Sequence, residues 1–276
     1  MNPRMDAVLS TIWSPLRDTA PMALFFILLA VIVKRAAILE AMRRVRREAT
    51  TNVLLFAINS MIVAPLVAIP FLTITGIVDG ERWFAGFWAG VPGVVVLLVT
   101  ILLIDLVAYW RHRLEHHPAL WRYHATHHAD TAIHWLSVHR KHPVGKALSM
   151  LVDLLLVLAL GLPVWAIVLA GVIRTWWGTF IHADVPWTLG PLGKVLISPA
   201  AHRLHHIRDE ALMGTNYGNT VTLWDRLFGT YVDPAPYIDC ETGIEEGTRG
   251  LLGELARPWE KRYRADATLA GEAGAA

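Results

Sequence analysis

The chain has 276 residues, of which 54% are hydrophobic and 12 are tryptophan, and its mean hydropathy is +0.42. This composition exceeds that of an ordinary soluble domain and indicates membrane-spanning helices. The net charge of only +2 gives no sign of nucleic-acid binding. The single cysteine, Cys240, excludes an intramolecular disulfide framework and a cysteine-based zinc or iron–sulfur site. Any metal site must therefore be rich in nitrogen ligands.

Residues 1–110 are predicted to form three transmembrane helices, at 21–39, 53–78 and 91–110. Each helix is to cross a hydrocarbon core about 30 Å thick. Pro65 and Pro70 are expected to kink the second helix. Trp83 and Trp88, in the loop 79–90, are expected to lie in an aromatic belt at the membrane interface.

The charges around the first helix predict its orientation. Arg4 and Arg17 precede it, whereas six basic residues follow it, which is the reverse of a cleaved signal peptide. The positive-inside rule therefore places the N-terminus outside the cell and an arginine-rich loop in the cytoplasm. Lys34 and Arg35 are expected to extend their charged ends to the interface. The six basic residues are Lys34, Arg35, Arg43, Arg44, Arg46 and Arg47.

A further apolar region at 148–180 is interrupted by Gly161 and Pro163. One straight helix would carry the next histidine, His182, to the far side of the bilayer, whereas a hairpin of two helices would return it. The hairpin is preferred because a metal centre needs its ligands on one side. We expect Asp153 and Arg174 to pair across this hairpin.

Histidines are strongly clustered along the chain. The first 111 residues contain none, whereas nine of the 13 lie between positions 105 and 142. Three histidine boxes, H-R-L-E-H (112–116), H-A-T-H-H (124–128) and H-R-L-H-H (202–206), repeat spacings of three and four residues that share one helix face. Convergent imidazoles suit first-row metals. Eight histidines exceed the needs of one ion, so the boxes predict two metal ions.

Pro118 is expected to end a helix at His117, which makes His116 a ligand and His117 a neighbour. His134 and His139 match no repeated spacing and are interpreted as structural. His142, before Pro143, is left open as a ligand.

Three acidic residues lie near the boxes. Asp105 either orients a ligating imidazole or pairs with Arg111 or Arg174. Asp225 either holds an imidazole N–H or contacts Arg226 or the backbone. Glu115 is interpreted as a solvated carboxylate. Downstream, Ser198 and Pro199 predict the first residues of a helix that carries the third box.

Together with His142-Pro143, N-Y-G (216–218) and W-D-R-L-F-G-T-Y (224–231), the three boxes resemble the fatty acid hydroxylase/sterol desaturase superfamily over residues 91–231. The resemblance implies an all-α integral membrane bundle, three spans plus the hairpin, with a cytoplasmic helical cap that carries the boxes. It also implies three regions: membrane helices at 1–110, a catalytic region at 111–233, and a soluble tail at 234–276. In the tail, residues 251–259 are expected at the membrane surface and the last dozen residues are expected to be disordered.

The resemblance also implies a non-haem di-iron enzyme that uses O2 and two electrons to hydroxylate or desaturate a lipid. Zinc is expected to be able to replace iron. No H-P-G-G segment of a fused cytochrome b5 domain is seen, so the electrons are expected from a separate donor, cytochrome b5-like or a ferredoxin with its reductase. Asn216 joins Asp105 and Asp225 as residues expected around the ligands. The implied ligands are His112, His116, His124, His127, His128, His182, His202, His205 and His206, with His142 open.

Two other classes of protein share some of these features. A histidine-rich metal-binding or transport protein would also be membrane-embedded, but it needs polar groups along its spans. The predicted spans contain only Asp105, Asp153 and Arg174, and the histidines lie outside them. A zinc hydrolase needs an open metal position with a general base beside it, and Glu115 is the only carboxylate within a box. The oxygenase is therefore the preferred interpretation.

Overall fold

The structure, a computed structural model, describes residues 3–68 and 85–263, and its regular elements are all helices. Within these residues, β-type pairing is limited to two isolated bridges, which confirms the all-α prediction. Residues 69–78 of the second predicted span, Trp83 and the last dozen residues lie outside the described residues. The longer helices are α1 (Pro3–Lys34), α2 (Ile38–Ile58), α5 (Gly93–Glu115), α6 (Pro118–His128), α7 (Pro143–Leu160) and α8 (Val164–Ile181). The shorter ones are α4 (Ala85–Ala89), α9 (Pro199–His205), α10 (Glu210–Met213), α11 (Leu223–Leu227) and α12 (Leu251–Ala256), with short helical turns at η1 (Arg35–Ala37), η2 (Asn59–Val63), η3 (Trp135–His139), η4 (Gly190–Lys194), η5 (Ala235–Tyr237) and η6 (Arg257–Trp259).

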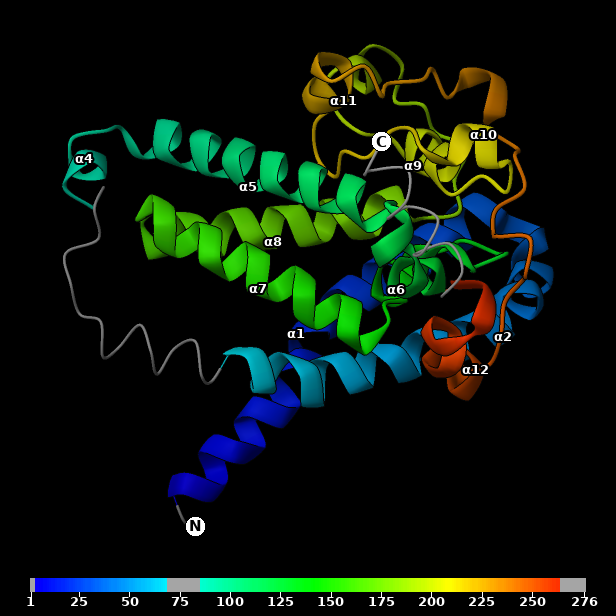
Figure 1. Cartoon of the computed structure of the whole chain (residues 1–276), viewed down its shortest axis with the longest axis horizontal. Helices are drawn as coiled ribbons and strands as arrows, with labels where there is room; N and C mark the ends of the chain where they lie inside the picture. The colour runs from blue at the N-terminus through cyan, green and yellow to red at the C-terminus, as the bar shows by residue number, and fades with distance from the viewer. Residues whose placement is uncertain (1–2, 69–84, 264–276) are drawn as a thin grey trace.

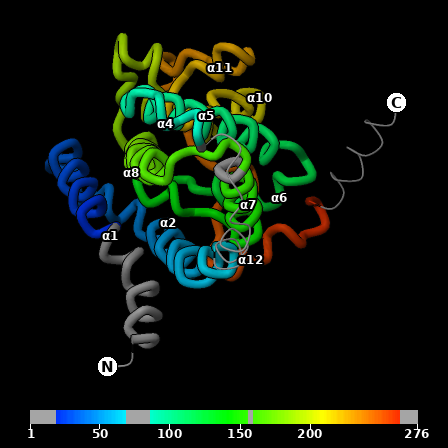
Figure 2. The backbone as a smooth tube through the Cα atoms, turned by 90° about the vertical axis from the view of Figure 1, so that its left-hand side faces the viewer, coloured from blue at the N-terminus to red at the C-terminus, as the bar shows by residue number. Residues whose placement is uncertain are grey.

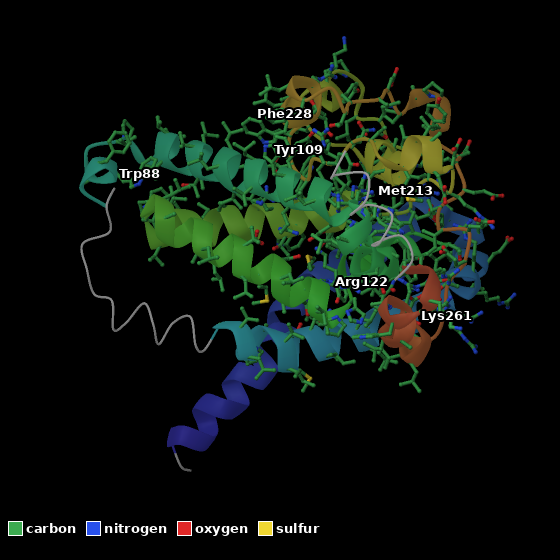
Figure 3. The ribbon with its side chains drawn as sticks, viewed as in Figure 1. Trp88, Tyr109, Arg122, Met213, Phe228 and Lys261 are labelled. Atoms are coloured by element: carbon green, nitrogen blue, oxygen red, sulfur yellow. The ribbon has the colours of Figure 1, made fainter. Side chains whose placement is uncertain are left out.

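Helices α5, α7 and α8 lie side by side (Figure 1) and are seen nearly end-on in Figure 2. The predicted hairpin is confirmed: α7 and α8 run in opposite directions and turn at Gly161, whose φ of 54° favours glycine. Pro163 then caps α8. At this end, Trp88 of α4 donates a hydrogen bond from Nε1 to the Leu160 carbonyl (3.2 Å) and lies far from Met213 in the opposite part of the molecule (Figure 3).

Three stretches of helix are long and apolar enough to cross a membrane: 19–68, 93–115 and 164–181. Their outer faces expose large apolar side chains, including Ile32, Val94 and Val168, each at least 60% exposed. A soluble protein would bury such a surface, whereas a bilayer solvates it. The chain is accordingly an integral membrane protein.

The N-terminal helices differ from the prediction in one respect. The expected arginine-rich loop is helical, because Arg43 to Arg47 lie within α2, and the chain bends earlier, at Arg35 (φ 47°). Lys34 pairs with Asp184 (2.8 Å) rather than extending to an interface. Near the end of this stretch the helix widens into the π-turn η2 directly before Pro65. Because proline cannot donate the next helical hydrogen bond, it accounts for the widening.

The other end of α5, α7 and α8 carries a cap, which consists of α6, α9 to α12 and their connecting loops (Figure 1). Its apolar core joins residues from α6 to the C-terminal segment, including Ala125, Leu204, Ile244 and Tyr263. The segment after residue 234, predicted as a soluble tail, therefore packs into the cap over its described part. In the stretch expected at the membrane surface, Leu252 is 80% exposed.

A buried ion network ties the cap to α2. Arg140 is fully buried and donates hydrogen bonds to Glu48 of α2 (2.6 Å) and Glu254 of α12 (2.7 Å). Glu254 also accepts hydrogen bonds from the buried Arg257. Each of these charges depends on its partners, because an ion taken out of water costs several kcal/mol.

Arg140→Met is expected to destabilise the protein by about 3 kcal/mol or more, because it leaves Glu48 buried without a cation. Thermal unfolding in detergent, followed by tryptophan fluorescence, measures the loss. Arg208→Met is the matched control, because Arg208 pairs with Glu241 at 3.9 Å on the exposed surface, where such pairs contribute about 0–1 kcal/mol. Equal melting temperatures for the two variants would contradict a structural role for the buried network.

Candidate metal centre

Nine histidines lie at the junction between the bundle and the cap and form two groups. Within each group, every histidine places one ring nitrogen within 4.8 Å of those of the others. All nine are residues that the sequence singled out as ligands. Neither group contains a carboxylate. The group of five consists of His112, His116, His124, His128 and His205, and the group of four consists of His127, His182, His202 and His206.

Each H-x-x-H-H box divides between the two groups. In α6, His124 and His128 face the group of five, whereas His127 faces the group of four. In the third box the division is reversed: His202 and His206 join the group of four and His205 joins the group of five. The spacing placed the three histidines of a box on one helix face, and the structure divides that face between the two groups. Adjacent helix positions are about 100° apart, so the fourth and fifth residues of a box point in different directions.

The remaining clustered histidines come from α5 and from the residue that follows α8. His112 and His116 lie four residues apart at the end of α5 and complete the group of five. His182 follows α8 directly and completes the group of four. The hairpin makes this possible, because it returns the chain to the cap. The two groups are adjacent, since the rings of His128 and His206 stack with centroids 4.3 Å apart.

Backbone carbonyls fix the orientation of imidazoles in the group of five. His112 donates from Nδ1 to the Tyr217 carbonyl (2.9 Å), and His205 donates from Nδ1 to the Thr215 carbonyl (2.7 Å). Because a carbonyl only accepts, both rings carry their proton on Nδ1, and their Nε2 lone pairs face the group. Asn216, between the two carbonyls, has a φ of 51° and exchanges hydrogen bonds with Val232. It thereby holds this loop in place.

The same pattern orients the group of four. His182 donates from Nδ1 to the Gly178 carbonyl (2.6 Å), and His127 donates to the Arg140 carbonyl (3.2 Å). Their Nε2 atoms, which then carry lone pairs, face each other at 3.4 Å. Two lone pairs at this distance repel unless a cation lies near both.

The donor set fits a metal ion. The buried Nε2 atoms of His112, His116 and His205 have no hydrogen-bond partner, which is costly for a polar atom unless a metal takes the lone pair. Second hydrogen bonds from Nδ1 to carbonyls are the usual support of a ligating imidazole. Neutral nitrogen donors of this kind suit iron, zinc and copper more than magnesium or calcium.

Burial also keeps these imidazoles neutral. The pKa of His182 and that of His205 are each lowered to about 3, mainly because desolvation disfavours the charged ring. Burial likewise lowers the pKa of His128 and His206, and neighbouring histidines lower it further. Around neutral pH the lone pairs are therefore free to bind a metal rather than a proton.

Glu115 was missed as part of the site. It lies beside His124, with Oε2 3.1 Å from Nδ1, and also accepts hydrogen bonds from Arg111 (3.0 Å) and Ser149 (2.7 Å). Its interpretation as a solvated carboxylate was wrong. The clue in the sequence was Arg111, which lies four residues before Glu115 and so on the same helix face.

The two aspartates act on the backbone rather than on imidazoles. Asp105 pairs with Arg174 and accepts hydrogen bonds from the Thr220 and Val221 amides. Asp225 accepts hydrogen bonds from the Tyr217 and Gly218 amides (2.7 and 2.8 Å). Of the alternatives, the arginine pair applies to Asp105 and the backbone contact to Asp225. Asp225 still supports the site, because the Tyr217 carbonyl orients His112.

The predicted Asp153–Arg174 pair is replaced by two others. Arg174 pairs with Asp105 on α5, and Asp153 accepts a hydrogen bond from Arg111 (3.2 Å) on the same helix. Both pairs cross from the hairpin to α5 rather than within the hairpin.

The other histidines lie outside both groups. His142 is buried, but its Nε2 lies 3.2 Å from the Leu255 carbonyl and its Nδ1 accepts from the Val144 amide. His117 caps the start of α6, as the proline after it predicts. His134 contacts the Ala132 carbonyl, and His139 lies against Phe56.

Several of the nine histidines line an apolar cavity and a small junction cavity, and a polar chamber lies next to the junction cavity. An apolar cavity of about 240 Å³ lies between α5, α6 and α7 and is lined by Val107, Trp110, Leu114, Leu148 and Val152, with His124 and His127 at one side. A polar chamber of about 470 Å³ lies between α2, η2, α5, α7 and α8, and its lining includes Asn59, Lys141, Lys146, Asp153 and Arg174. A junction cavity of about 80 Å³ touches His112, His124, His127, His182 and His202 and shares lining residues with both larger cavities.

Comparison with known proteins identifies the same region. Residues 97–230 match the fatty acid hydroxylase family. The chain is 29% identical over 175 residues to ornithine lipid hydroxylase OlsE of Rhizobium tropici, a match that covers 63% of this chain and 53% of that protein.

Two further relatives are similar over about half of the chain. Identity to alkylglycerol monooxygenase of Xenopus tropicalis is 31% over 136 residues, 49% of this chain and 30% of that protein. Identity to Delta(7)-sterol 5(6)-desaturase ERG3B of Gibberella zeae is 31% over 164 residues, 57% of this chain and 48% of that protein. The chain thus spans about half the length of these relatives or less. No solved structure matches it.

His128→Ala is expected to remove metal from the group of five while the group of four keeps its own, so that metal content falls by about half. Elemental analysis of protein purified without chelators measures the content per chain. His206→Ala should have the converse effect, because it belongs to the other group. His117→Ala is the control, since His117 is exposed and outside both groups. Full metal content in His128→Ala, or a loss in His117→Ala, would contradict the assignment.

Proposed function

We propose that the chain, whose residues 97–230 match the fatty acid hydroxylase family, is a membrane-bound non-haem di-iron oxygenase acting on a lipid. The observation that carries this proposal is the pair of adjacent, carboxylate-free histidine groups. The relatives are named as lipid hydroxylases, monooxygenases and sterol desaturases, which favours hydroxylation or desaturation of a C–H bond.

We propose that the nine histidines hold two iron ions, one in each group. When bound, iron supplies the reduction of O2 and the oxidising power needed to break an unactivated C–H bond. Zinc would occupy the same nitrogen donors without this redox chemistry. His142 is not included among the proposed ligands, because both of its nitrogens have other partners.

The protein's own contribution is to orient the ligands. The carbonyls of Tyr217, Thr215, Gly178 and Arg140 hold four imidazoles with Nε2 turned inward. Glu115 accepts from Nδ1 of His124 in the same way, and its charge raises the electron density of that imidazole. These contacts set the donor atoms in place before a metal binds, which reduces the reorganisation that binding requires.

The protein also excludes water and positions the substrate. His128, His205 and His206 are fully buried, so solvent has no direct path to the metals through them. The apolar cavity approaches the same histidines from α5 and α7, and Trp110, Leu114 and Leu148 at its walls are partly exposed on the outer face. A lipid could thus reach the site from the bilayer without crossing water.

We propose that the two electrons come from a separate donor, cytochrome b5-like or a ferredoxin with its reductase. We propose that this donor binds at the cap, because the cap lies next to the histidines and is not made of exposed apolar helices. By the positive-inside rule, the basic residues of α2 favour a cytoplasmic cap and an external end at α4.

Metal transport is the less favoured alternative. A transported ion needs ligands distributed across the membrane, whereas all nine clustered histidines lie at the cap end of the bundle.

Cells that express the protein are expected to contain a lipid that has gained one oxygen atom or lost two hydrogen atoms, because these are the two outcomes of C–H oxidation at such a site. Lipid mass spectrometry against cells that express the His128→Ala/His206→Ala variant checks this. Identical lipid profiles at equal protein levels and adequate iron would contradict the proposed activity.

A cysteine at Asp209, in the cap, is expected to be labelled from the cytoplasm, and one at Gly90, beyond the start of α5, from outside. Both positions are exposed, and the 23-residue α5 between them is about 34 Å long at 1.5 Å per residue. Membrane-impermeant maleimide, applied to intact and opened cells in a Cys240→Ser background, measures sidedness. Labelling of both positions from one side would show that α5 does not cross the membrane.

A further inference from the structure

The polar chamber has an unusual electrostatic character for a space among apolar helices. Three cationic residues line it, Lys141, Lys146 and Arg174, against one carboxylate, Asp153. Ionisable groups are expensive at such depth and commonly mark a path for a substrate or an ion. The chamber therefore calls for a functional explanation.

The two lysines lack direct partners. Arg174 is paired with Asp105, and Asp153 accepts from Arg111. Across the described residues, by contrast, no ion pair or hydrogen bond involves the ammonium group of Lys141 or Lys146. Both lysines are half-buried, and a cation partly withdrawn from water is unfavourable when it has no partner. Burial accordingly lowers the pKa of Lys141, while the charge of Glu115 raises it. An anion in the chamber would supply the missing partner.

Lys141 also lies where the cavities meet. It lines the polar chamber, the junction cavity and the apolar cavity. His124 and His127 line the junction and the apolar cavity. A molecule that extends from the apolar cavity into the polar chamber therefore passes Lys141 and both groups of histidines.

We propose that the substrate is an amphiphile with an anionic head group, a carboxylate or a phosphate, that binds across Lys141. The head group lies in the polar chamber against Lys141 and Lys146, and the hydrocarbon chain lies in the apolar cavity. The carbons beside the histidines are then those next to the head group rather than those at the chain end. This inference rests on the proposed function, since it names the substrate class for the same site.

Binding of two probes with the same chain tests the inference. Radiolabelled hexadecanoate and hexadecanol are titrated against the full-length, zinc-loaded protein in neutral detergent. The wild-type protein is expected to bind hexadecanoate about tenfold more tightly, in line with a hydrogen bond to a charged group. Lys141→Met and Lys146→Met should each reduce this preference and leave hexadecanol binding unchanged. Lys194→Met, an exposed residue outside the cavities, should bind both probes as the wild type does.

The hydrocarbon site has its own pair of variants. Val107→Trp fills the apolar cavity and should weaken binding of both probes. Val172→Trp, on the outer face of α8 and half exposed, should weaken neither. Acetate should not displace hexadecanoate, because it carries the charge without the chain. Wild-type zinc content and melting temperature identify the variants that are folded.

Equal affinity of the wild type for the two probes would overturn the inference. An equal loss of affinity for both probes in folded Lys141→Met and Lys146→Met would also overturn it. Displacement of hexadecanoate by acetate would overturn it as well, because it would indicate a site for a free anion. Binding requires no oxidation, so this result is separable from the lipid profile. Charge-selective binding without oxidised lipid would contradict only the proposed activity, and oxidised lipid without charge selectivity would contradict only the anionic substrate.

Discussion

Nine clustered imidazoles with converging nitrogen atoms, seven of them buried, are the constraint on which the structure depends. Hydrogen bonds from Nδ1 to carbonyls force the lone pairs of His112, His205, His127 and His182 inward. Without a cation near them, these lone pairs would repel one another. This arrangement is maintained by the backbone carbonyls of the loop at 215–217, of the last turns of α8 and of Arg140. Arg140 therefore has two roles, because its carbonyl orients His127 while its side chain fastens the cap to α2.

The sequence predicted which histidines come together, because this depends mainly on local helix geometry. Residues four apart on a helix meet on one face, so each pair, such as His112 and His116, is visible in the spacing. The hairpin was equally accessible, since the apolar region at 148–180 is much longer than the roughly 20 residues that one span needs, and Gly161 and Pro163 mark the turn. His182 then follows from the requirement that its ligating nitrogen return to the others.

Spacing separates the fourth and fifth residues of a box, but it does not show which group each histidine joins, because that depends on how α6 and α9 are rotated about their axes when they pack. The partners of charged residues were also mispredicted. Asp153 and Arg174 each bond to α5 instead of to each other, since the closest opposite charge depends on three-helix packing and not on the hairpin alone. The supporting carbonyls cannot be found from composition, because every residue carries one. Glu115 was misassigned for a related reason: its partner, His124, lies on another helix.

Positive charge at the histidine groups and at the nearby lysines would act on any molecule that occupies the cavities. Divalent metals held by neutral imidazoles keep most of their positive charge, and Glu115 is the one carboxylate that bonds to a clustered imidazole among the described residues. Lys141 and Lys146 add further positive charge on the side of the polar chamber. In a dry environment such charges are screened weakly, so their combined field extends across the junction cavity. A cationic head group would be repelled by this field, whereas an anionic one would neutralise part of it. The carboxylate-free histidine groups and the unpaired lysines thus favour the same kind of substrate.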